Sequence, residues 1–345
     1  MNNSTLKVLL DSVVSLLPKR QKDIITQRFG LGSLRTRTLA FLGNKYGITR
    51  ERVRQIEAAS LRMLAKSAQD NSEIHTLYKK AVDHITSLGG ARRADFLVDD
   101  LKLVFQDKTL SDSYVTLLFS IFKTPAYEPE GEDLFAFWYT SPEALREVKQ
   151  FTQKVAQFLK NKKEALIERG EFDALFAQVT KQHAIKEFVA LNFLLNSKKF
   201  SVNPYGDFGL VEWAEIAPKT VRDKAYLVLK KRKSPMHFRE IAQEINKVKF
   251  DAKKAHPQTV HNELIKNDKR FVLVGRGLYS LREFGIEPGT TRDVLLRLLK
   301  KHGAMPLDKI VKLVSQERVL KHNTIFLNLQ NKKYFKKQNG HYHLA

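Results

Sequence analysis

The sequence of 345 residues lacks cysteine and long apolar runs, and each absence excludes classes of protein. Without cysteine there is no disulfide bond, no cysteine-ligated zinc site and no cysteine nucleophile. No apolar run approaches the roughly 18 residues that a membrane-spanning helix requires. The apolar run at 6–17 contains Lys7 and Asp11 and has no small-residue cleavage site, so a signal peptide is not expected. We therefore expect a cytoplasmic protein without a membrane partner.

Patterns that would carry catalysis or hold a cofactor are also scarce. The sequence has no glycine-rich loop of the P-loop or dinucleotide-binding type. His341 and His343 alternate on an expected strand, but no carboxylate or cysteine cluster accompanies them to complete a metal site. Asp99, Asp100 and Asp107 lack the arrangement of a metal nuclease. We predict that the protein is not an enzyme and has no catalytic residue, metal ligand or cofactor.

Negative charge is scarce at both ends of the chain. The formal net charge is +23, from 60 Lys and Arg against 37 Asp and Glu. Residues 1–70 carry a net +8 and residues 219–345 a net +18, whereas residues 71–218 carry a net −3. Because basic surfaces attract phosphates, both ends suit double-stranded DNA and the centre does not. We expect the protein to be associated with the nucleoid.

Residues 38–57 contain two helical patterns joined by a glycine turn. Leu39, Leu42 and Tyr46 share one face of the first helix. Gly47 stands where this helix must stop, in the left-handed position that glycine favours, and Thr49 can cap the next helix. The second helix has its own apolar positions, which are Val53, Ile56, Leu61 and Leu64. The pattern predicts a helix-turn-helix with a packed core.

The second helix of this motif exposes four residues of the kinds that read DNA bases. They are Arg50, Glu51, Arg54 and Gln55. Arg and Gln can bond to guanine and adenine edges in a major groove, and Glu can accept a hydrogen bond from cytosine. We therefore predict base contacts by these four side chains.

A longer series of linked residues surrounds this helix. In order, it comprises Leu17-Pro18, Arg28-Phe29-Gly30, Thr38-Leu39, Leu42-Gly43, Tyr46-Gly47-Ile48, the run Thr49 to Ala58, and Leu61-Arg62. On these residues, 16–66 resembles region 4 of bacterial sigma-70 family factors, which recognises the promoter −35 element. The resemblance implies the base contacts above, a partner in core RNA polymerase, and phosphate contacts by Arg35, Arg37, Thr38, Thr49 and Arg52. Phe41 and Asn44-Lys45 depart from the family, which usually has acidic residues there.

A second series begins at Thr220. It comprises Val221-Arg222-Asp223 with Tyr226, the run Pro235 to Ile241, Thr259-Val260 with Leu264, and the run Gly275 to Leu281. Residues 220–284 thereby resemble a HARE-HTH domain, a winged-helix module of bacterial polymerase-associated, restriction-linked and chromatin-associated proteins. The resemblance implies a winged-helix fold and contact with DNA. Asp251 to Pro257 forms a longer, lysine-rich link before the helix that is expected to enter a groove.

A helix followed by a basic hairpin recurs three times in the second half of the chain. The expected helices span 185–195, 257–265 and 324–329. The expected hairpins, each with a glycine in its turn, span 198–210, 269–279 and 332–344. This order is typical of winged helices, and a weaker copy spans 75–139, with its last strand at 134–139. The wings predict phosphate contacts by Lys269, Arg270, Arg276, Lys332, Lys333, Lys336 and Lys337.

The middle of the chain lacks a resemblance of this kind. Residues 143–180 read as long periodic helices, and Pro142 suits a helix start. The acidic loop Glu128 to Asp133 would repel DNA and is expected to face solvent or a protein partner. Trp138 and Trp213 are expected in the core and not stacked on bases. We predict a spacer or a protein-binding surface.

Together these patterns predict a mainly α protein, in which a helix-turn-helix domain precedes tandem winged-helix domains with short β-hairpin wings. The predicted domains are a helix-turn-helix at 1–70, a degenerate winged helix at 71–142, a helical or winged-helix spacer at 143–218, a HARE-HTH winged helix at 219–285 and a C-terminal winged helix at 286–345.

Three functions fit this organisation. The first is a transcription regulator that reads a −35-like promoter element, with winged helices adding DNA or polymerase contacts. The second is a nucleoid-type structural protein that binds DNA by charge with little sequence preference. The third is a DNA-targeting subunit of a restriction-like system. A complete sigma factor is not expected, because no aromatic-rich region that would melt the −10 element is found.

Overall fold

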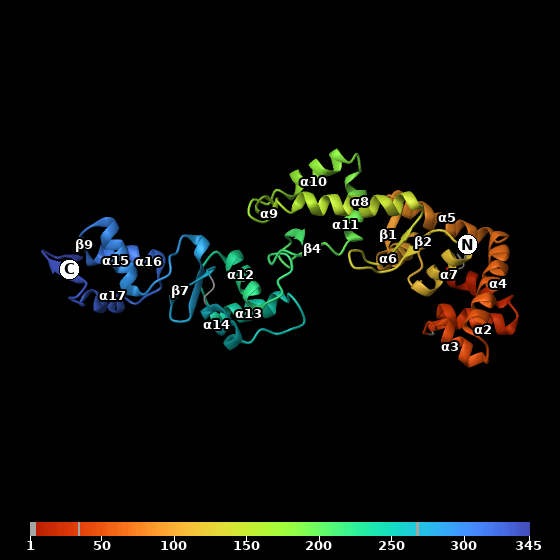
Figure 1. The fold of residues 1–345 in the computed structure, drawn as a ribbon, viewed down its shortest axis with the longest axis horizontal. Helices are drawn as coiled ribbons and strands as arrows, with labels where there is room; N and C mark the ends of the chain where they lie inside the picture. The colour runs from red at the N-terminus through yellow and green to blue at the C-terminus, as the bar shows by residue number, and fades with distance from the viewer. Residues whose placement is uncertain (1–4, 34, 267–268) are drawn as a thin grey trace. The chain divides into compact units, whose positions relative to one another are not determined.

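A computed structural model describes residues 5–33, 35–266 and 269–345 (Figure 1). Helices joined by short antiparallel sheets make up most of the described chain, which confirms the predicted mainly α fold. The chain divides into two compact units. Unit 1 comprises Met1–Ser201 with Phe208–Val211, and unit 2 comprises Val202–Asp207 with Glu212–Ala345. Among the described helices, none combines the length and the apolar character that a lipid bilayer would require.

Unit 1 begins with a bundle of helices. Its elements are α1 (Leu6–Ser15), α2 (Lys19–Phe29), the short 3-10 helix η1 (Leu31–Ser33), α3 (Leu39–Tyr46) and α4 (Arg50–Gln69). A small core of Ile24, Leu42 and Val53 holds α2, α3 and α4 together. Leu39, Tyr46 and Ile56 pack against this core, as the apolar periodicity of the sequence predicted.

The next segment of unit 1 has the order of elements found in a winged helix. It comprises α5 (Ser72–Ser87), β1 (Ala91–Arg93), α6 (Ala94–Val104), α7 (Asp112–Phe122), β2 (Ala126–Glu128) and β3 (Phe137–Tyr139). The sheet has the order β1-β3-β2, with the last strand in the middle. The sequence placed the last strand at 134–139, but pairing with β1 and β2 begins at Phe137. Leu134 instead forms a bridge with Ser197.

One hydrophobic core crosses residue 70, where the sequence suggested a domain boundary. Leu6 and Leu64, from α1 and α4, belong to the same cluster as Tyr114, Phe119 and Trp138. The apolar side of α7 therefore packs against α1 and α4 as well as against its own sheet. The helix-turn-helix and the first winged helix share a core in this way.

The rest of unit 1 consists of four helices and a hairpin. They are α8 (Pro142–Leu159), α9 (Lys163–Ile167), α10 (Phe172–Gln182), α11 (Glu187–Leu195), β4 (Phe200–Val202) and β5 (Phe208–Leu210). Pro142 occupies the first helical position of α8, as predicted. The periodic stretch 143–180 is not continuous helix, because the chain leaves helical geometry after Leu159 and again before Phe172, where Gly170 has a φ of +66°.

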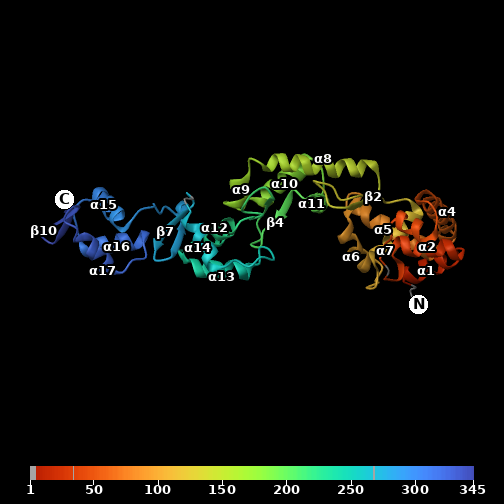
Figure 2. The same cartoon turned by 60° about the horizontal axis from the view of Figure 1, so that its bottom comes forward.

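Unit 2 contains two further winged-helix modules with separate cores (Figures 1 and 2). The first, which we call the central module (219–284), comprises α12 (Val221–Arg232), β6 (Met236–His237), α13 (Phe238–Val248), α14 (Pro257–Ile265), β7 (Phe271–Gly275), β8 (Leu278–Leu281) and the 3-10 helix η2 (Arg282–Phe284). The second, the C-terminal module (290–345), comprises α15 (Thr291–His302), β9 (Met305–Pro306), α16 (Leu307–Glu317), α17 (His322–Leu329), β10 (Phe335–Gln338) and β11 (His341–Leu344).

The sheets of these two modules repeat the strand order of the first winged helix. The central module has the order β6-β8-β7 and the C-terminal module the order β10-β11-β9. In each, the final strand lies between the short first strand and the other strand of the hairpin. The hairpins that the sequence predicted at 269–279 and 332–344 are therefore the wings of complete three-stranded sheets.

Candidate nucleic-acid interface

The turn between α3 and α4 is built by caps that the sequence predicted. Gly47 ends α3 in the left-handed conformation, with a φ of +62°. The Thr49 hydroxyl caps α4 by accepting a hydrogen bond from the Arg52 amide at 3.1 Å. A Cβ atom on Gly43 would lie 2.8 Å from the Ile48 carbonyl oxygen. The two helices therefore approach so closely that position 43 accommodates no side chain without backbone movement.

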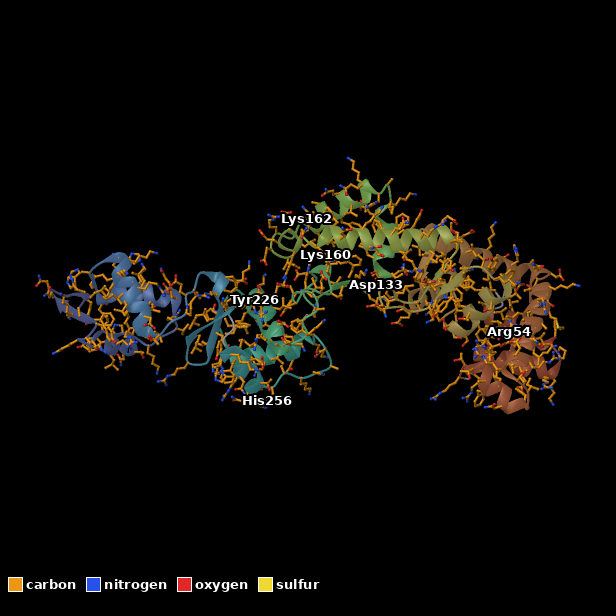
Figure 3. The ribbon with its side chains drawn as sticks, in the orientation of Figure 1. Arg54, Asp133, Lys160, Lys162, Tyr226 and His256 are labelled. Carbon is orange, nitrogen blue, oxygen red and sulfur yellow. The ribbon has the colours of Figure 1, made fainter. Side chains whose placement is uncertain are left out.

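The tight turn fixes which side of α4 faces outward. Val53 is completely buried against Leu42 and Ile24. Since helical residues three or four apart share a face, the opposite side of the first two turns faces solvent. That side carries all four predicted base-reading residues, which are Arg50, Glu51, Arg54 and Gln55. Figure 3 shows Arg54 at the surface of the molecule.

The exposed side chains of α4 bond to each other in the free protein. Arg54 donates two hydrogen bonds to the Glu51 carboxylate, at 2.9 and 2.7 Å. Arg52 donates to the Gln55 side-chain oxygen at 3.1 Å. The hydrogen bond from Arg54 lowers the pKa of Glu51, so this residue is a charged acceptor at neutral pH. Because water screens an exposed pair, a base edge or a phosphate can compete for either partner.

The segment before α3 carries Arg35, Arg37 and Thr38, three of the predicted phosphate contacts, and all are exposed. Thr38 caps α3 by accepting from the Phe41 amide at 3.1 Å. The Arg37 guanidinium carbon lies 4.5 Å from the centre of the Phe41 ring. Phe41, which departs from the sigma pattern, therefore serves as a platform for a predicted phosphate-binding arginine.

Arg28 positions this segment, a role that the sequence analysis missed. Its Nη1 donates to the Arg37 carbonyl at 3.2 Å, and its Nε donates to Glu57 on α4 at 3.2 Å. Arg28 thus ties the segment before α3 to the second turn of the helix that carries Arg54. The signal was present in the sequence as Arg28-Phe29-Gly30, but only the fold brings Arg28 to Glu57.

In the central module the predicted wing residues fall into two groups. Lys269 and Arg276 are exposed, and Arg276 lies in the turn between β7 and β8. Arg270 instead pairs with Asp223 at 3.2 Å and lies over the Tyr226 ring at 5.4 Å. The structure thus places Arg270 in a contact that supports the module, next to Tyr226, whose pKa is raised to about 12 by burial and by its bond to Glu283.

Helix α14 presents a polar face that the sequence analysis did not assign. Gln258, Thr259 and Asn262 are exposed, whereas Val260 and Leu264 are buried in the module's core. The Asn246 side chain holds the preceding loop by bonds to both the amide and the carbonyl of Ala255, at 2.7 and 2.9 Å. The alternation of Gln258, Thr259 and Asn262 with buried Val260 and Leu264 could have revealed this face.

The C-terminal wing carries the remaining predicted phosphate contacts. Lys332, Lys333, Lys336 and Lys337 are all exposed. Phe335 and Tyr342 are buried beneath the wing and anchor it to the module. Lys337 lies over the Tyr342 ring, with its ammonium nitrogen 5.4 Å from the ring centre. The buried aromatic residues therefore hold a surface of four lysines toward solvent.

Comparison with known families identifies two of these surfaces. The family model for sigma-70, region 4 matches residues 13–66, and the model for HARE-HTH, described as a restriction endonuclease HTH domain, matches residues 219–284. Both are DNA-binding domains. Neither is an enzymatic domain. The two resemblances predicted from the sequence are thereby confirmed.

The curated relatives match only the N-terminal region. The RNA polymerase sigma factor SigA of Bacillus sp. is 49% identical over 59 residues, which is 17% of this chain and 16% of the relative. The same values hold for the RNA polymerase sigma factor SigA of Listeria monocytogenes serovar 1/2a (strain ATCC BAA-679 / EGD-e). The chain thus spans about a sixth of the length of the curated relatives it matches.

Unlike the sigma-70 region 4 and HARE-HTH domains, the first winged helix has its DNA-binding elements engaged within the chain. Helix α7 stands where a winged helix has its recognition helix, but Val115, Leu118 and Phe119 are buried in the shared core. The Tyr114 hydroxyl donates to the Asp11 carboxylate at 2.9 Å, which ties α7 to α1. Helix α7 therefore supports the helix-turn-helix and presents only its polar edge to solvent.

The acidic loop of this winged helix is neutralised by lysines of unit 1. Lys149, Lys198 and Lys199 pair with Glu128, Glu130 and Asp133, at 2.6, 2.5 and 2.7 Å respectively. The Lys198 amide also donates to the Asp133 carbonyl at 2.8 Å. Most of the loop is exposed to solvent, as expected, but the fold brings to its carboxylates basic residues that are distant in sequence.

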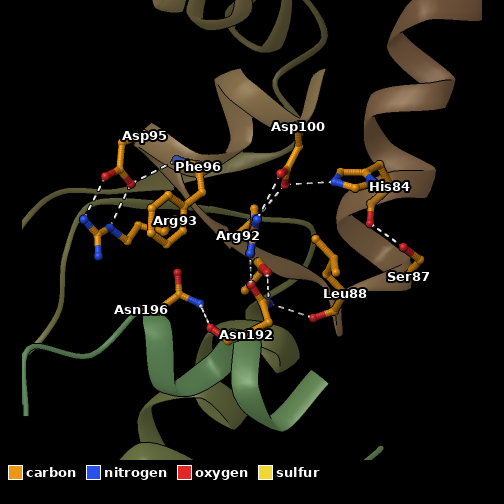
Figure 4. A network of polar contacts seen from close by, with 11 residues as sticks. His84, Ser87, Leu88, Arg92, Arg93, Asp95, Phe96, Asp100, Asn192 and Asn196 are labelled. Atoms are coloured by element: carbon orange, nitrogen blue, oxygen red, sulfur yellow. Dashed lines mark hydrogen bonds and ion pairs between the residues drawn. The ribbon is translucent and has the colours of Figure 1, made fainter. Parts of the chain in front are cut away.

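Helix α11 docks on the same winged helix through a polar network (Figure 4). The Asn192 side-chain amide donates to the carbonyls of Leu88 and Ala91, at 2.9 and 2.6 Å, and its oxygen accepts from Arg92 at 3.0 Å. Arg92 in turn makes two hydrogen bonds to Asp100, at 2.6 and 3.0 Å. His84 lies 3.0 Å from the same carboxylate.

The charge of Asp100 is stabilised within this network. Burial raises the pKa of Asp100, but the hydrogen bonds from His84 and Arg92 outweigh it, and the pKa lies below its usual value. A charged, bonded carboxylate therefore holds Arg92 in the position that receives Asn192. The network fixes α11 to the first winged helix and, through the shared core, to the helix-turn-helix.

Proposed function

We propose that this protein is a sequence-specific transcription regulator that reads a −35-like promoter element. The observation that carries the proposal is the exposed first half of α4, held by the close turn at Gly43 and Gly47. In this proposal Arg50, Glu51, Arg54 and Gln55 contact bases. The polar and charged side chains of this surface match the donor and acceptor pattern of a major groove.

Phosphate contacts position the reading helix in this proposal. Arg35, Arg37 and Thr38 line the approach to α3, and Thr49 and Arg52 stand at the start of α4. Since backbone contacts set register without reading sequence, these residues supply affinity and the base contacts supply specificity. Arg28 supports both sets by tying them together.

The winged-helix modules of unit 2 add a second DNA surface. We propose phosphate contacts by Lys269 and Arg276 of the central wing and by Lys332, Lys333, Lys336 and Lys337 of the C-terminal wing. The polar face of α14 adds candidate base contacts by Gln258, Thr259 and Asn262. In this division into five domains, residues 71–218 form the spacer between the two DNA-binding ends.

Core RNA polymerase is a proposed protein partner, on the strength of the sigma factors that residues 13–66 resemble. A nucleoid-type structural protein is the second candidate, which the net charge of +23 favours. A DNA-targeting subunit of a restriction-like system follows only from the family to which the central module is similar. Capture of core polymerase by the full chain supports the first candidate and not the third.

The decisive test is Arg54→Ala on a preferred site found by genome-wide footprinting. We expect a loss of about 1–3 kcal/mol on that site, because a bidentate base contact disappears, and relaxed specificity at one position. Arg62→Ala is the matched control, since Arg62 is also an exposed arginine of α4 but lies two turns further along. Equal weakening of all sequences by Arg54→Ala would instead support the nucleoid-type function.

A further inference from the structure

A buried arginine lies at the boundary between the two modules of unit 2. Arg318 follows the last residue of α16 and is only 4% exposed. Its guanidinium donates to the carbonyl oxygens of Glu317, Glu287 and Gly289. Glu287 and Gly289 belong to the short link between the central and C-terminal modules. Arg318 therefore fastens this link to the end of α16.

Charged groups around Arg318 strengthen the same junction. Arg297 on α15 pairs with Glu287 at 3.0 Å and also with Glu317. The link is thus held to α15 by an ion pair and to α16 by a buried guanidinium. Since a buried arginine without acceptors would cost much free energy, its carbonyl partners are constrained to stay in place.

The residue after Arg318 reaches the sheet of the other module. The Val319 amide donates to the Val274 carbonyl of β7 at 2.8 Å. β7 is an edge strand in the order β6-β8-β7, so a backbone from the C-terminal module extends its free side. A Cβ atom on Gly275 would lie 2.9 Å from the Val319 carbonyl oxygen, so the two backbones meet without room for a side chain.

The contact brings exposed basic residues of two modules to one junction. Arg276, in the central wing, is two residues from Val274. Lys321, at the start of α17, is two residues from Val319. Both are exposed. The wing of one module and the first turn of the other module's third helix therefore lie at the same junction.

We propose that Arg318 is a positioning residue that locks the central and C-terminal modules into one DNA-binding surface, in which Arg276 and Lys321 contact phosphates of the same duplex. This inference rests on the proposed function, in which both modules bind DNA. A locked pair presents its second set of contacts already aligned once the first is made. A loose pair must align its second module by diffusion within the tether, which lowers the effective concentration.

The test compares Arg318→Met and Gly275→Ala in the full chain. Arg318→Met keeps the length of the side chain but removes every donor, and Gly275→Ala leaves Arg318 intact but pushes Val319 away. Arg282→Met is the matched control, an exposed arginine of η2 that lies outside the junction. Hydrogen exchange at the Val319 amide reports the junction, and fluorescence anisotropy reports binding to 12- and 30-base-pair duplexes, lengths chosen for about one and about two modules' contacts.

We expect both variants to accelerate exchange at Val319 and to weaken binding to the longer duplex by roughly tenfold, with little change on the shorter one. The control should match the wild type. Faster exchange with unchanged affinity for the longer duplex would overturn the inference, as would unchanged exchange in both variants. Arg276→Ala combined with Lys321→Ala separates the two levels, because no effect on affinity or salt dependence would refute DNA binding by the junction itself.

Discussion

At the scale of single residues, Gly43 decides how closely the two helices of the DNA-reading motif approach. The residue is helical, so its importance comes from space and not from a special backbone conformation. Its neighbours are backbone atoms, the Ile48 carbonyl oxygen and the Arg50 amide nitrogen, at 2.8 and 3.3 Å from a Cβ atom. Backbone atoms cannot move aside as a flexible side chain can.

We predict that Gly43→Ala destabilises unit 1 by about 1–3 kcal/mol, in the range of other overpacking substitutions. The free energy of unfolding in urea measures this effect. Gly131→Ala is the matched control, because a Cβ there meets no atom within 4 Å and Gly131 does not have a positive φ. Equal stability of the two variants would show that the turn relaxes without cost.

Local residue patterns predicted much of this site. The caps at Gly47 and Thr49 were predictable because capping depends on a few neighbouring residues. The partners of Arg28 and Arg270 were not, since Glu57 and Asp223 are 29 and 47 residues away in sequence. A charge pattern shows that a residue can bind phosphate, but only the fold shows whether an acidic residue already holds it.

At the scale of elements, α11 depends on the Asp100 network for its place on the first winged helix. The pKa of Asp100 is lowered in the folded protein. A lowered pKa means that the charged carboxylate stabilises the fold above its unfolded pKa of roughly 3.9, and that this contribution is lost as the pH falls through the folded pKa. The network is therefore sensitive to acid and insensitive to changes near neutral pH.

We predict that Asp100→Asn lowers the urea midpoint of unit 1 at pH 7 and that the difference from wild type shrinks at pH 3, where the wild-type carboxyl is closer to its protonated form. Asp99→Asn is the control, since Asp99 is exposed and pairs with Lys102 on the same helix. A difference that stays constant between pH 7 and pH 3 would contradict a role for the Asp100 charge.

Element order was predictable, and element use was not. The hairpins at 269–279 and 332–344 follow from β-prone runs and glycine turns. Nothing local in the α7 sequence shows that Leu118 packs against α1 and α4 and not under a DNA-reading surface. A recognition helix and a buried helix have similar apolar periodicity, so their roles differ only through what covers them.

At the scale of the whole molecule, charge separates the ends of the chain from its middle. The middle is close to neutral, and its acidic loop is paired with lysines of the same unit. The C-terminal wing, by contrast, holds four exposed lysines over a buried aromatic base. DNA affinity should therefore depend on salt mainly through the two ends.

We predict that changing Lys332, Lys333, Lys336 and Lys337 together to Ala lowers the slope of log affinity against log salt concentration by up to about 3 to 4, since each phosphate contact contributes about 0.9. Binding titrations between 50 and 300 mM salt, roughly the range in which counterion release dominates, measure the slope. The control changes Lys79, Lys80, Lys108 and Lys123 of the first winged helix. A reduction of the same size in the control would indicate that the whole basic surface binds without distinction.

The sequence by itself determined the reading helix, its caps, the wings and the basic ends, because each depends on residues within about one turn or hairpin of each other. Only the tertiary structure decided which of these elements are free. It buried α7 in a core shared with the helix-turn-helix, paired the acidic loop with Lys149, Lys198 and Lys199, and placed Arg318 at the joint between two modules. Those outcomes depend on contacts between residues far apart in the chain, where local propensity carries no information and packing decides.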